Sequence, residues 1–354
     1  PHTRTPLLRL SKYPKARYMI RNTIFSPMAM LATRLLLIST TGVRGFGSNT
    51  RSLAHLASRT FVSTGRANTP PMASTVGTSD GSGGEGIFLF DFDGVVCDSC
   101  DECTVSAFRT CKDLGVLPPD VTVAAPPPWL FNKMREIRPA IEVGWQIPVL
   151  LAVFLDQKNK SERPGGPAAM TVAEILENYE SLVQNSLDAW GKDARNLIDA
   201  FGGVRDSWIA DDLGSWLDIN TFYPGVPAAF QSCRGEIVLV TTKQQRFAVA
   251  LCRHAGVVPS ALPDGRIYGL GMYGSKADVV ADRMEKGGHA PEDTHFFEDR
   301  WPTLAKCLKD ERLSGVRFYL CSWGYCTPAE LELANAEPRV DVIDLEDFAT
   351  IVSK

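Results

Sequence analysis

The sequence predicts an α/β protein in which a doubly wound, Rossmann-like parallel sheet carries an inserted helical domain. Short apolar runs at 87–90 and 236–240 are typical of strands buried on both faces of such a sheet. Helical patterns separate these runs, which predicts βαβ units. The stretch from 99 to 223 has helical periodicity and no convincing strand, so we interpret it as an insertion. A length of 354 residues suits two domains.

The N-terminal region differs from the rest of the chain in charge. The first 79 residues hold 11 of the 37 Lys and Arg and none of the 41 Asp and Glu, so the remainder has a formal charge of −15. This Arg-, Ser- and Thr-rich segment is typical of an organellar transit peptide, and a Gly-rich linker follows at 73–86. The alternative, a basic tail for nucleic acid, is disfavoured because the charges are dispersed. We therefore assign 1–86 to presequence and linker, and expect no nucleic-acid partner.

Composition excludes several classes of protein. Hydrophobic residues make up 44% and charged residues 22%, which disfavours whole-chain disorder. The longest apolar run, Val149 to Leu155, is too short to cross a bilayer, so no membrane span is predicted. The nine cysteines do not suggest a secreted disulfide framework. Four of them lie close together in the sequence, at Cys97, Cys100, Cys103 and Cys111, and could in principle bind a metal. Their spacing fits no standard metal site, so we interpret them as small buried residues.

Four strands are expected in the core, which we assign to 87–100 and 224–354. They lie at 87–90, 236–240, 294–297 and 316–320, and polar residues follow several of them. In a doubly wound sheet the ligand crevice lies beyond these carboxyl ends.

The inserted domain, 101–223, has helical patterns at 171–190 and 194–201 and a Trp-containing stretch at 208–217. We expect a loop at 118–129, because consecutive prolines cannot supply helix hydrogen bonds.

The strongest chemical signal is a pair of carboxylates, Asp91 and Asp93, directly after the first strand. An Asp nucleophile can attack a phosphoryl group only where Mg2+, a cation and hydrogen-bond donors neutralise the converging negative charge. Asp93 is placed to supply a proton to the leaving oxygen. Gly94 lets the backbone turn sharply beside the substrate.

The segment from Asp91 to Ser99 resembles the first motif of the haloacid dehalogenase-like (HAD) hydrolases, in the DxDGxxxDS form common among their phosphatases. Later elements follow the family order: Thr241 after a hydrophobic strand, Lys276 in Gly-Ser-Lys, then Glu298 and Asp299 after another strand. Glu298 stands where the family usually has Asp.

The resemblance implies a role for each matching position. Asp91 would be the nucleophile and Asp93 the general acid and base, which also binds the metal through its main-chain carbonyl. The implied phosphoryl-binding residues are Thr241, with Thr242 beside it, and Lys276; the implied Mg2+ ligands are Asp91, Asp93, Asp299 and Glu298.

Asp91 and Thr241 are 150 positions apart, and the stretch between them occupies the place where the family carries a cap domain. Candidate cap contacts to substrate are Arg138, Glu142 and Trp145, although a solvated charge pair and a core Trp explain them equally well. The segments 296–304 and 323–325 resemble a plant and algal branch of the family, which favours a chloroplast over a mitochondrial address.

Several conspicuous residues have structural interpretations. Lys243 is expected to be solvated, the histidines at 254, 289 and 295 to be structural, and Trp208 and Trp216 to pack in the cap. The function expected is a Mg2+-dependent phosphatase acting on a small phosphorylated metabolite through an aspartyl-phosphate. Alternatives are a phosphomutase, a phosphonate hydrolase with Lys112 or Lys133 as Schiff base, a carbon–halogen hydrolase, and a catalytically inactive binding module. The residues leave substrate identity and oligomeric state open.

Overall fold

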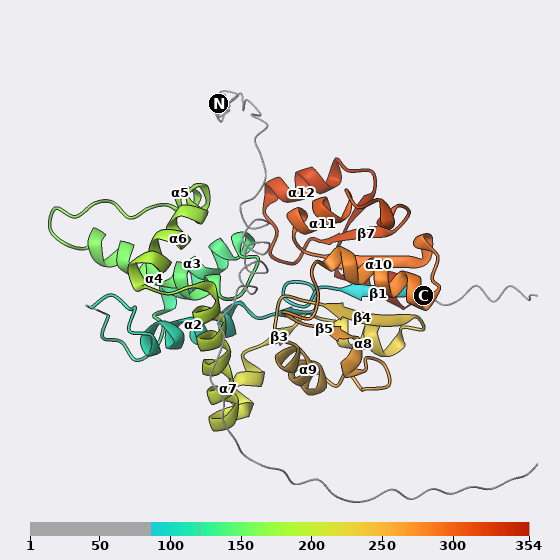
Figure 1. Cartoon of the computed structure of the whole chain (residues 1–354), viewed down its shortest axis with the longest axis horizontal. Helices are drawn as coiled ribbons and strands as arrows, with labels where there is room; N and C mark the ends of the chain where they lie inside the picture. The colour runs from blue at the N-terminus through green and yellow to red at the C-terminus, as the bar shows by residue number, and fades with distance from the viewer. Residues whose placement is uncertain (1–85, 120, 354) are drawn as a thin grey trace, which may run out of the picture. The chain divides into compact units, whose positions relative to one another are not determined.

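The computed structural model describes residues 86–119 and 121–353; the predicted presequence and all but the last residue of the linker lie outside them. Six parallel strands form one sheet in the order β5-β4-β1-β6-β7-β8 (Figure 1). The strands are β1 (Ile87–Phe90), β4 (Glu236–Val240), β5 (Ile267–Tyr268), β6 (Thr294–Glu298), β7 (Arg317–Cys321) and β8 (Val340–Ile343). The predicted doubly wound α/β fold is therefore confirmed, with two strands, β5 and β8, that the sequence did not reveal.

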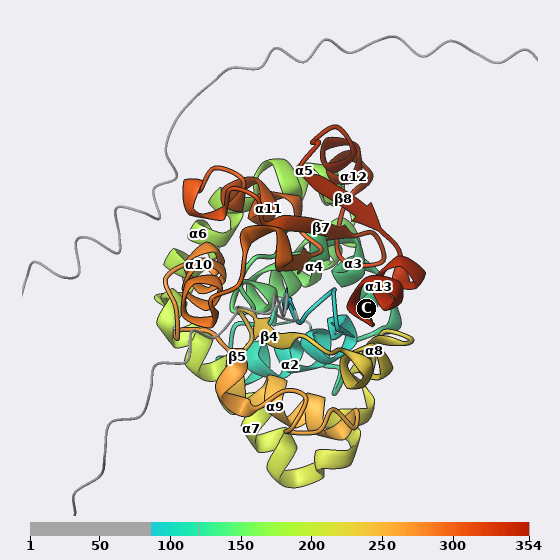
Figure 2. The ribbon, with the colours of Figure 1, turned by 90° about the vertical axis from the view of Figure 1, so that its right-hand side faces the viewer.

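Helices cover both faces of this sheet, because alternate residues of each strand point to opposite faces. Phe88 and Phe90 belong to one apolar cluster, with α8 (Val226–Ser232), α9 (Gln245–His254) and α13 (Leu345–Val352). Ile87 and Leu89 belong to another, with α10 (Lys276–Gly287), α11 (Trp301–Cys307) and α12 (Pro328–Asn335) (Figure 2). Short 3-10 turns lie at Arg138–Ala140, Asp264–Arg266, Pro291–Asp293 and Glu311–Leu313.

A group of helices lies between the first and second sheet strands of the chain. Its members are α2 (Cys100–Asp113), α3 (Pro128–Ile137), α4 (Gln146–Ser161), α5 (Val172–Glu177), α6 (Tyr179–Trp190) and α7 (Ala194–Asp218). We call this group the cap. Two short antiparallel strands, β2 (Cys97–Asp98) and β3 (Thr221–Phe222), connect it to the sheet (Figure 1).

The structure corrects three local expectations. The stretch from 99 to 223 does contain a strand, β3, which is too short to show a sequence pattern and exists because it pairs with β2. The expected loop at 118–129 ends early, because Pro128 begins α3, where the first helical turn needs no N–H donor. The helical pattern at 171–190 is two helices that meet at Asn178.

The order of the strands creates a topological switch point at β1 and β6. From β1 the chain continues to β4 and β5 on one side, whereas from β6 it continues to β7 and β8 on the other. A crevice therefore opens beyond the carboxyl ends of β1 and β6. Among the described residues, no helix combines the length and the apolar character that crossing a membrane requires.

Candidate active site

A cavity of about 320 Å3 lies at this switch point. From the sheet side it is lined by Asp91, Asp93, Lys276 and Glu298, among others. The cap contributes the segment from Arg138 to Val143. The cavity therefore brings together residues from both parts of the described chain, as a site beneath a cap requires.

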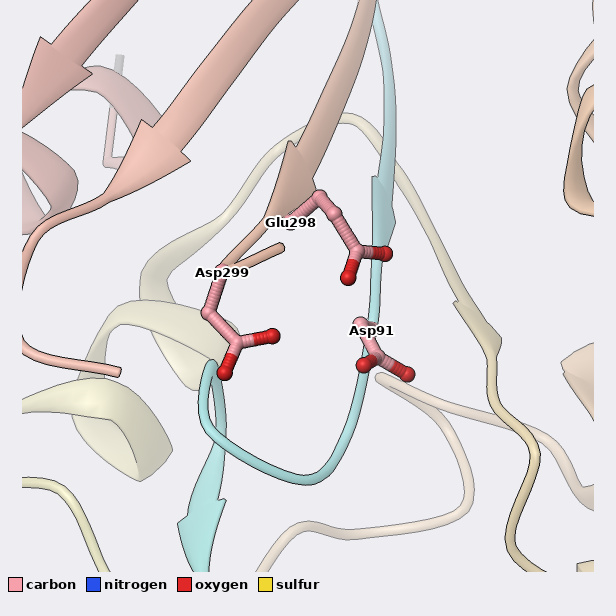
Figure 3. A group of neighbouring side chains, drawn as sticks. All are labelled: Asp91, Glu298 and Asp299. Atoms are coloured by element: carbon pink, nitrogen blue, oxygen red, sulfur yellow. The ribbon is translucent and has the colours of Figure 1, made fainter. Parts of the chain in front are cut away.

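Three carboxylates, those of Asp91, Glu298 and Asp299, converge at one end of the cavity (Figure 3). One oxygen from each lies within 4.8 Å of the others. All three residues are buried, and Glu298 Oε1 and Asp299 Oδ1 accept no hydrogen bond from the described residues. Burial raises the pKa of Glu298 and of Asp299, and the Asp91 carboxylate adds to both shifts, although Lys276 opposes them. Unpartnered, crowded carboxylate oxygens fit a hard divalent cation, which would neutralise them.

Lys276 is the cation that the structure itself provides at this cluster. Its Nζ lies 2.9 Å from Asp91 Oδ1 and 2.7 Å from Glu298 Oε2. Burial lowers the pKa of Lys276, but the two carboxylates raise it well above the usual value. Ser275 caps α10 and thereby fixes the helix start at Lys276. The lysine is thus held charged beside Asp91.

Asp93 lies in a different environment, beside Lys243. The expectation that Lys243 is solvated was wrong. The Lys243 side chain is only 2% exposed, and its Nζ lies 3.1 Å from Asp93 Oδ1. The strand end is covered by the cap, so the lysine is buried instead of solvated. Burial raises the pKa of Asp93, but Lys243, Arg138 and the Ser99 hydroxyl together lower it below its usual value.

Lys243 in turn contacts a buried ion pair of the cap. The guanidinium of Arg205, on α7, donates to both carboxylate oxygens of Glu102, on α2, at 2.7 and 2.8 Å. Glu102 Oε2 lies 4.0 Å from Lys243 Nζ. Burial raises the pKa of Glu102, but Arg205 and Lys243 lower it to about 2. A continuous buried charge network therefore runs from the cap to Asp93.

Two glycines allow the close approach of the loops around Asp299. Gly94 has φ 95°, and a Cβ there would lie 1.8 Å from Asp299 Oδ2. A Cβ at Gly324 would lie 2.3 Å from the Cβ of Asp299. The loop after β7 then presents the Tyr325 N–H to Asp299 Oδ2 at 2.6 Å.

Tyr325 also contacts the connection between sheet and cap. Its hydroxyl donates to Asp98 Oδ1 at 2.7 Å and accepts from the Ser99 N–H at 3.0 Å. Asp98 pairs with Arg135 of the cap at 2.8 Å. The ring of Tyr325 lies under Arg138, with 4.2 Å from the guanidinium carbon to the ring centroid. Tyr325 thus contacts Asp299 through its backbone and the cap connection through its side chain.

The two threonines after β4 are placed differently. Thr241 is fully buried, and its Oγ1 accepts a hydrogen bond from the Lys243 N–H. Thr242 lines the cavity, and its Oγ1 donates to the Glu142 carbonyl of the cap at 3.1 Å. Thr242 is therefore the better placed of the two to contact a ligand in this cavity.

The three candidate cap residues occupy different positions relative to the cavity. Arg138 is 8% exposed and lines the cavity. Glu142 lies at the cavity rim, where its carboxylate pairs with Lys306 at 3.1 Å. Trp145 lines a smaller chamber that adjoins the main cavity. Neither Lys112 nor Lys133 is among the residues that line either space, which disfavours a Schiff-base mechanism.

Of the remaining conspicuous residues, His295 and the four cysteines have structural positions as expected, whereas the two tryptophans pack against the sheet and not in a core of the cap alone. His295 stacks between the rings of Phe88 and Tyr319. Trp208 and Trp216 are buried in the apolar cluster that α7 shares with the sheet. The four cysteines of the 97–111 segment are also buried, and burial raises the pKa of each thiol.

Sequence reasoning missed Tyr325, Glu102 and Arg205 as members of the site. Tyr325 lies just beyond the carboxyl end of β7, and that position was an available signal. Arg205 lies in the middle of a long helix and is 103 residues from Glu102, so no local pattern indicated their pairing.

No protein-family model matches the sequence, and no curated protein matches it. Among solved structures, a predicted phosphatase from Clostridium acetobutylicum is similar, with 17% identity and a TM-score of 0.47, covering 76% of this chain and 98% of that one. A predicted phosphoglycolate phosphatase from Haemophilus somnus has 15% identity and a TM-score of 0.46, with 77% and 99% covered. A haloacid dehalogenase-like hydrolase from Streptococcus pneumoniae has 17% identity and a TM-score of 0.39, with 75% and 98% covered. Similarity at this level does not identify the chemistry, which depends on the side chains of the site.

Proposed function

We propose that this chain is a Mg2+-dependent phosphatase of the HAD-like hydrolase superfamily, acting on a small phosphorylated metabolite. One observation carries the proposal: the Asp91 carboxylate faces Lys276 and two further buried carboxylates, while Asp93 lies two residues on beside a second buried lysine. A nucleophile and a proton carrier thus share one cavity, each with its own cation. The DxDGxxxDS motif supports the same assignment.

The residues that would hold Mg2+ are Asp91, Glu298 and Asp299, whose oxygens converge. Bound there, the cation would offset the negative charge of the carboxylates and of the phosphoryl group. Lys276 would contribute further positive charge to the transferring group, and the Thr242 hydroxyl would turn from the Glu142 carbonyl to donate a hydrogen bond to it.

In the first step, an oxygen of Asp91 forms a bond to phosphorus while the bond from phosphorus to the leaving oxygen breaks. The leaving oxygen takes the proton of the Asp93 carboxyl group. In the second step, water attacks the phosphorus of the aspartyl-phosphate, its proton passes to Asp93, and the bond to Asp91 breaks. Phosphate leaves, and Asp93 is again protonated for the next turnover. The lowered pKa of Asp93 keeps it ionised before a substrate binds, whereas the negative charge of a bound phosphate ester would favour the protonated form that the first step needs.

The test combines phosphate release with detection of the covalent intermediate. We expect the full chain with Mg2+ to release phosphate from small phosphomonoesters, and borohydride reduction during turnover to convert Asp91 to homoserine. Asp91→Asn should abolish both signals. Asp199→Asn, an exposed carboxylate on α7, serves as the matched control. Activity that survives Asp91→Asn would exclude Asp91 as the nucleophile, and rearrangement of the ester without phosphate release would indicate a mutase instead.

The chloroplast address is also a proposal, which rests on the composition of residues 1–79. Imaging of the chain with a C-terminal fluorescent tag in plant cells tests it.

A further inference from the structure

A tyrosine in the wall of the main cavity has no role in the proposed mechanism. Tyr273 lies in the loop between β5 and α10 and lines this cavity together with Asp91 and Lys276. Its side chain is half-buried, but the hydroxyl oxygen is buried and forms no hydrogen bond with any described residue. A buried tyrosine hydroxyl usually has a partner, because leaving it unbonded costs free energy. The unsatisfied hydroxyl therefore indicates an acceptor from outside the chain.

The charges around the hydroxyl show which way it faces. Tyr273 also borders a second pocket, beside α10. Burial raises the pKa of Tyr273, Lys276 opposes this shift, and the carboxylates of Asp91, Glu298 and Glu142 add to it. All four of these charged residues line the main cavity, so the hydroxyl faces the cavity and not the second pocket. A raised pKa keeps the phenol protonated, and a protonated phenol can donate a hydrogen bond.

The loop that carries Tyr273 is fixed at both ends. The Leu270 N–H donates to the Lys243 carbonyl at 2.9 Å, which ties the loop to the residues after β4. A Cβ at Gly269 would lie 2.3 Å from a backbone nitrogen at the start of α9, so the loop packs directly against that helix. At the other end, Ser275 caps α10. The hydroxyl is thus held in place before a ligand binds, as a donor to a reacting group should be.

The position of the hydroxyl decides which part of a phosphate ester it would meet. In the proposed reaction an oxygen of Asp91 bonds to phosphorus, and Lys276 Nζ lies 2.9 Å from Asp91 Oδ1. The leaving oxygen lies toward Asp93, the proposed proton donor. Asp93 lines the smaller adjoining chamber, whereas Asp91 and Tyr273 are not among the residues that line it. The hydroxyl therefore lies on the side of the transferring phosphoryl group, away from the leaving group.

We propose that Tyr273 is a further phosphoryl-binding residue, whose hydroxyl donates a hydrogen bond to a non-bridging oxygen of the transferring phosphoryl group. This assignment rests on the proposed phosphatase function and adds a neutral donor to Lys276 and Thr242. Every phosphomonoester has the same phosphoryl group, so the contact contributes to the rate with any ester and not to the choice among esters.

The test removes this hydroxyl alone, in Tyr273→Phe of the full chain with Mg2+. We expect kcat/KM to fall by about 10- to 100-fold, the loss of a hydrogen bond to a charged acceptor. The factor should be the same for isopropyl phosphate and p-nitrophenyl phosphate, whose leaving groups differ. Tyr179→Phe is the matched control, because its hydroxyl on α6 is also buried and unpartnered but Tyr179 lines neither space; it should keep its activity.

Thermal melting without ligand separates this role from a structural one. Tyr273→Phe should melt at the wild-type temperature or above it, because the hydroxyl bonds to no described residue. A lower melting temperature would indicate a structural role and overturn the inference.

The remaining outcomes separate this inference from the proposed function. An unchanged kcat/KM in Tyr273→Phe, or a loss confined to one ester, would overturn the inference and leave the phosphatase assignment intact. If no ester is hydrolysed, calorimetric binding of inorganic phosphate with Mg2+ still tests the contact. Weaker binding to Tyr273→Phe than to the wild type would support it, whereas equal affinity, or no binding to either protein, would exclude it.

Discussion

The two ends of the cavity differ in the sign of their buried charge. At the metal end, three carboxylates surround one lysine, and two of their oxygens lack hydrogen-bond donors. At the cap end, the buried carboxylates of Asp93 and Glu102 face three buried cations, which are Lys243, Arg205 and Arg138. Asp91 and Asp93 are only two residues apart, yet each belongs to a different end. The difference teaches that one sharp turn places two like carboxylates in different surroundings, Asp91 beside two further carboxylates and Asp93 beside cationic side chains.

The largest effect is expected from crowding the metal end, because this change should remove both stability and Mg2+ binding. In Gly94→Ala, the new Cβ would lie 1.8 Å from Asp299 Oδ2, and a φ of 95° is strained for alanine. We expect the free energy of unfolding to fall by more than about 2 kcal/mol, and Mg2+ to lose its effect on the melting temperature. Gly203→Ala in α7, where a Cβ meets nothing within 4 Å, is the control. Retained Mg2+ stabilisation in Gly94→Ala would contradict the close packing of this loop against Asp299.

The next effect is expected from removing a buried arginine from the charge network at the cap end. Arg205→Met leaves the Glu102 carboxylate buried without its main partner, which we expect to cost about 3–5 kcal/mol in urea denaturation. Arg195→Met removes an exposed arginine from the same helix and should change stability by less than about 0.5 kcal/mol. If the two variants unfold at the same urea concentration, the buried network does not stabilise the cap.

A smaller effect is expected where the two ends are joined. Tyr325→Phe removes the hydroxyl bonded to Asp98 and Ser99 but keeps the backbone N–H that donates to Asp299. We expect kcat/KM to fall by about tenfold, the loss of roughly one buried hydrogen bond, with an unchanged Mg2+ activation constant. Tyr179→Phe, whose buried hydroxyl has no partner, should retain activity. A shifted Mg2+ constant in Tyr325→Phe would show that the hydroxyl also supports the metal end.

The last effect is a pH dependence of opposite sign at the two ends. The pKa of Glu102 is lowered from 4.5 to about 2, so its contribution to stability is present above pH 4.5 and lost as the pH falls toward 2. The pKa of Glu298 is raised by burial, so in chelator its ionisation destabilises the fold as the pH rises above the usual carboxyl range.

Denaturation across pH in the wild type, Glu102→Gln and Glu298→Gln checks both signs. The advantage of wild type over Glu102→Gln should shrink on acidification, whereas its advantage over Glu298→Gln should shrink on raising the pH. Parallel profiles for the three proteins would refute the contrast between the ends.

The sequence was informative wherever function depends on the end of a strand. Asp91, Glu298 and Thr241 each follow or end a short apolar run, and parallel strands bring their carboxyl ends to one edge. Their proximity was therefore predictable before any tertiary contact was known. The strands β5 and β8 were not predicted: β5 has only two residues, and Asp341 interrupts the apolar run of β8.

Contacts between cap and sheet were not predictable in this way. Lys243 was expected in solvent because a lysine at a strand end is normally exposed, and only the cap above it makes it a buried partner of Asp93. Tyr325 is 227 residues from Asp98, and the bond between them depends on the packing of the loop after β7.

The sequence by itself determined the sheet architecture, the helical insertion and the two carboxylates that carry the proposed chemistry, because these depend on local periodicity and on residue type. Only the tertiary structure decided which charges are buried and which of them are paired. Burial converts a solvated side chain into a strong local charge whose effect depends on neighbours far along the chain. The burial of Lys243 beside Asp93, and of Arg138 over the Tyr325 ring, belongs to this second category.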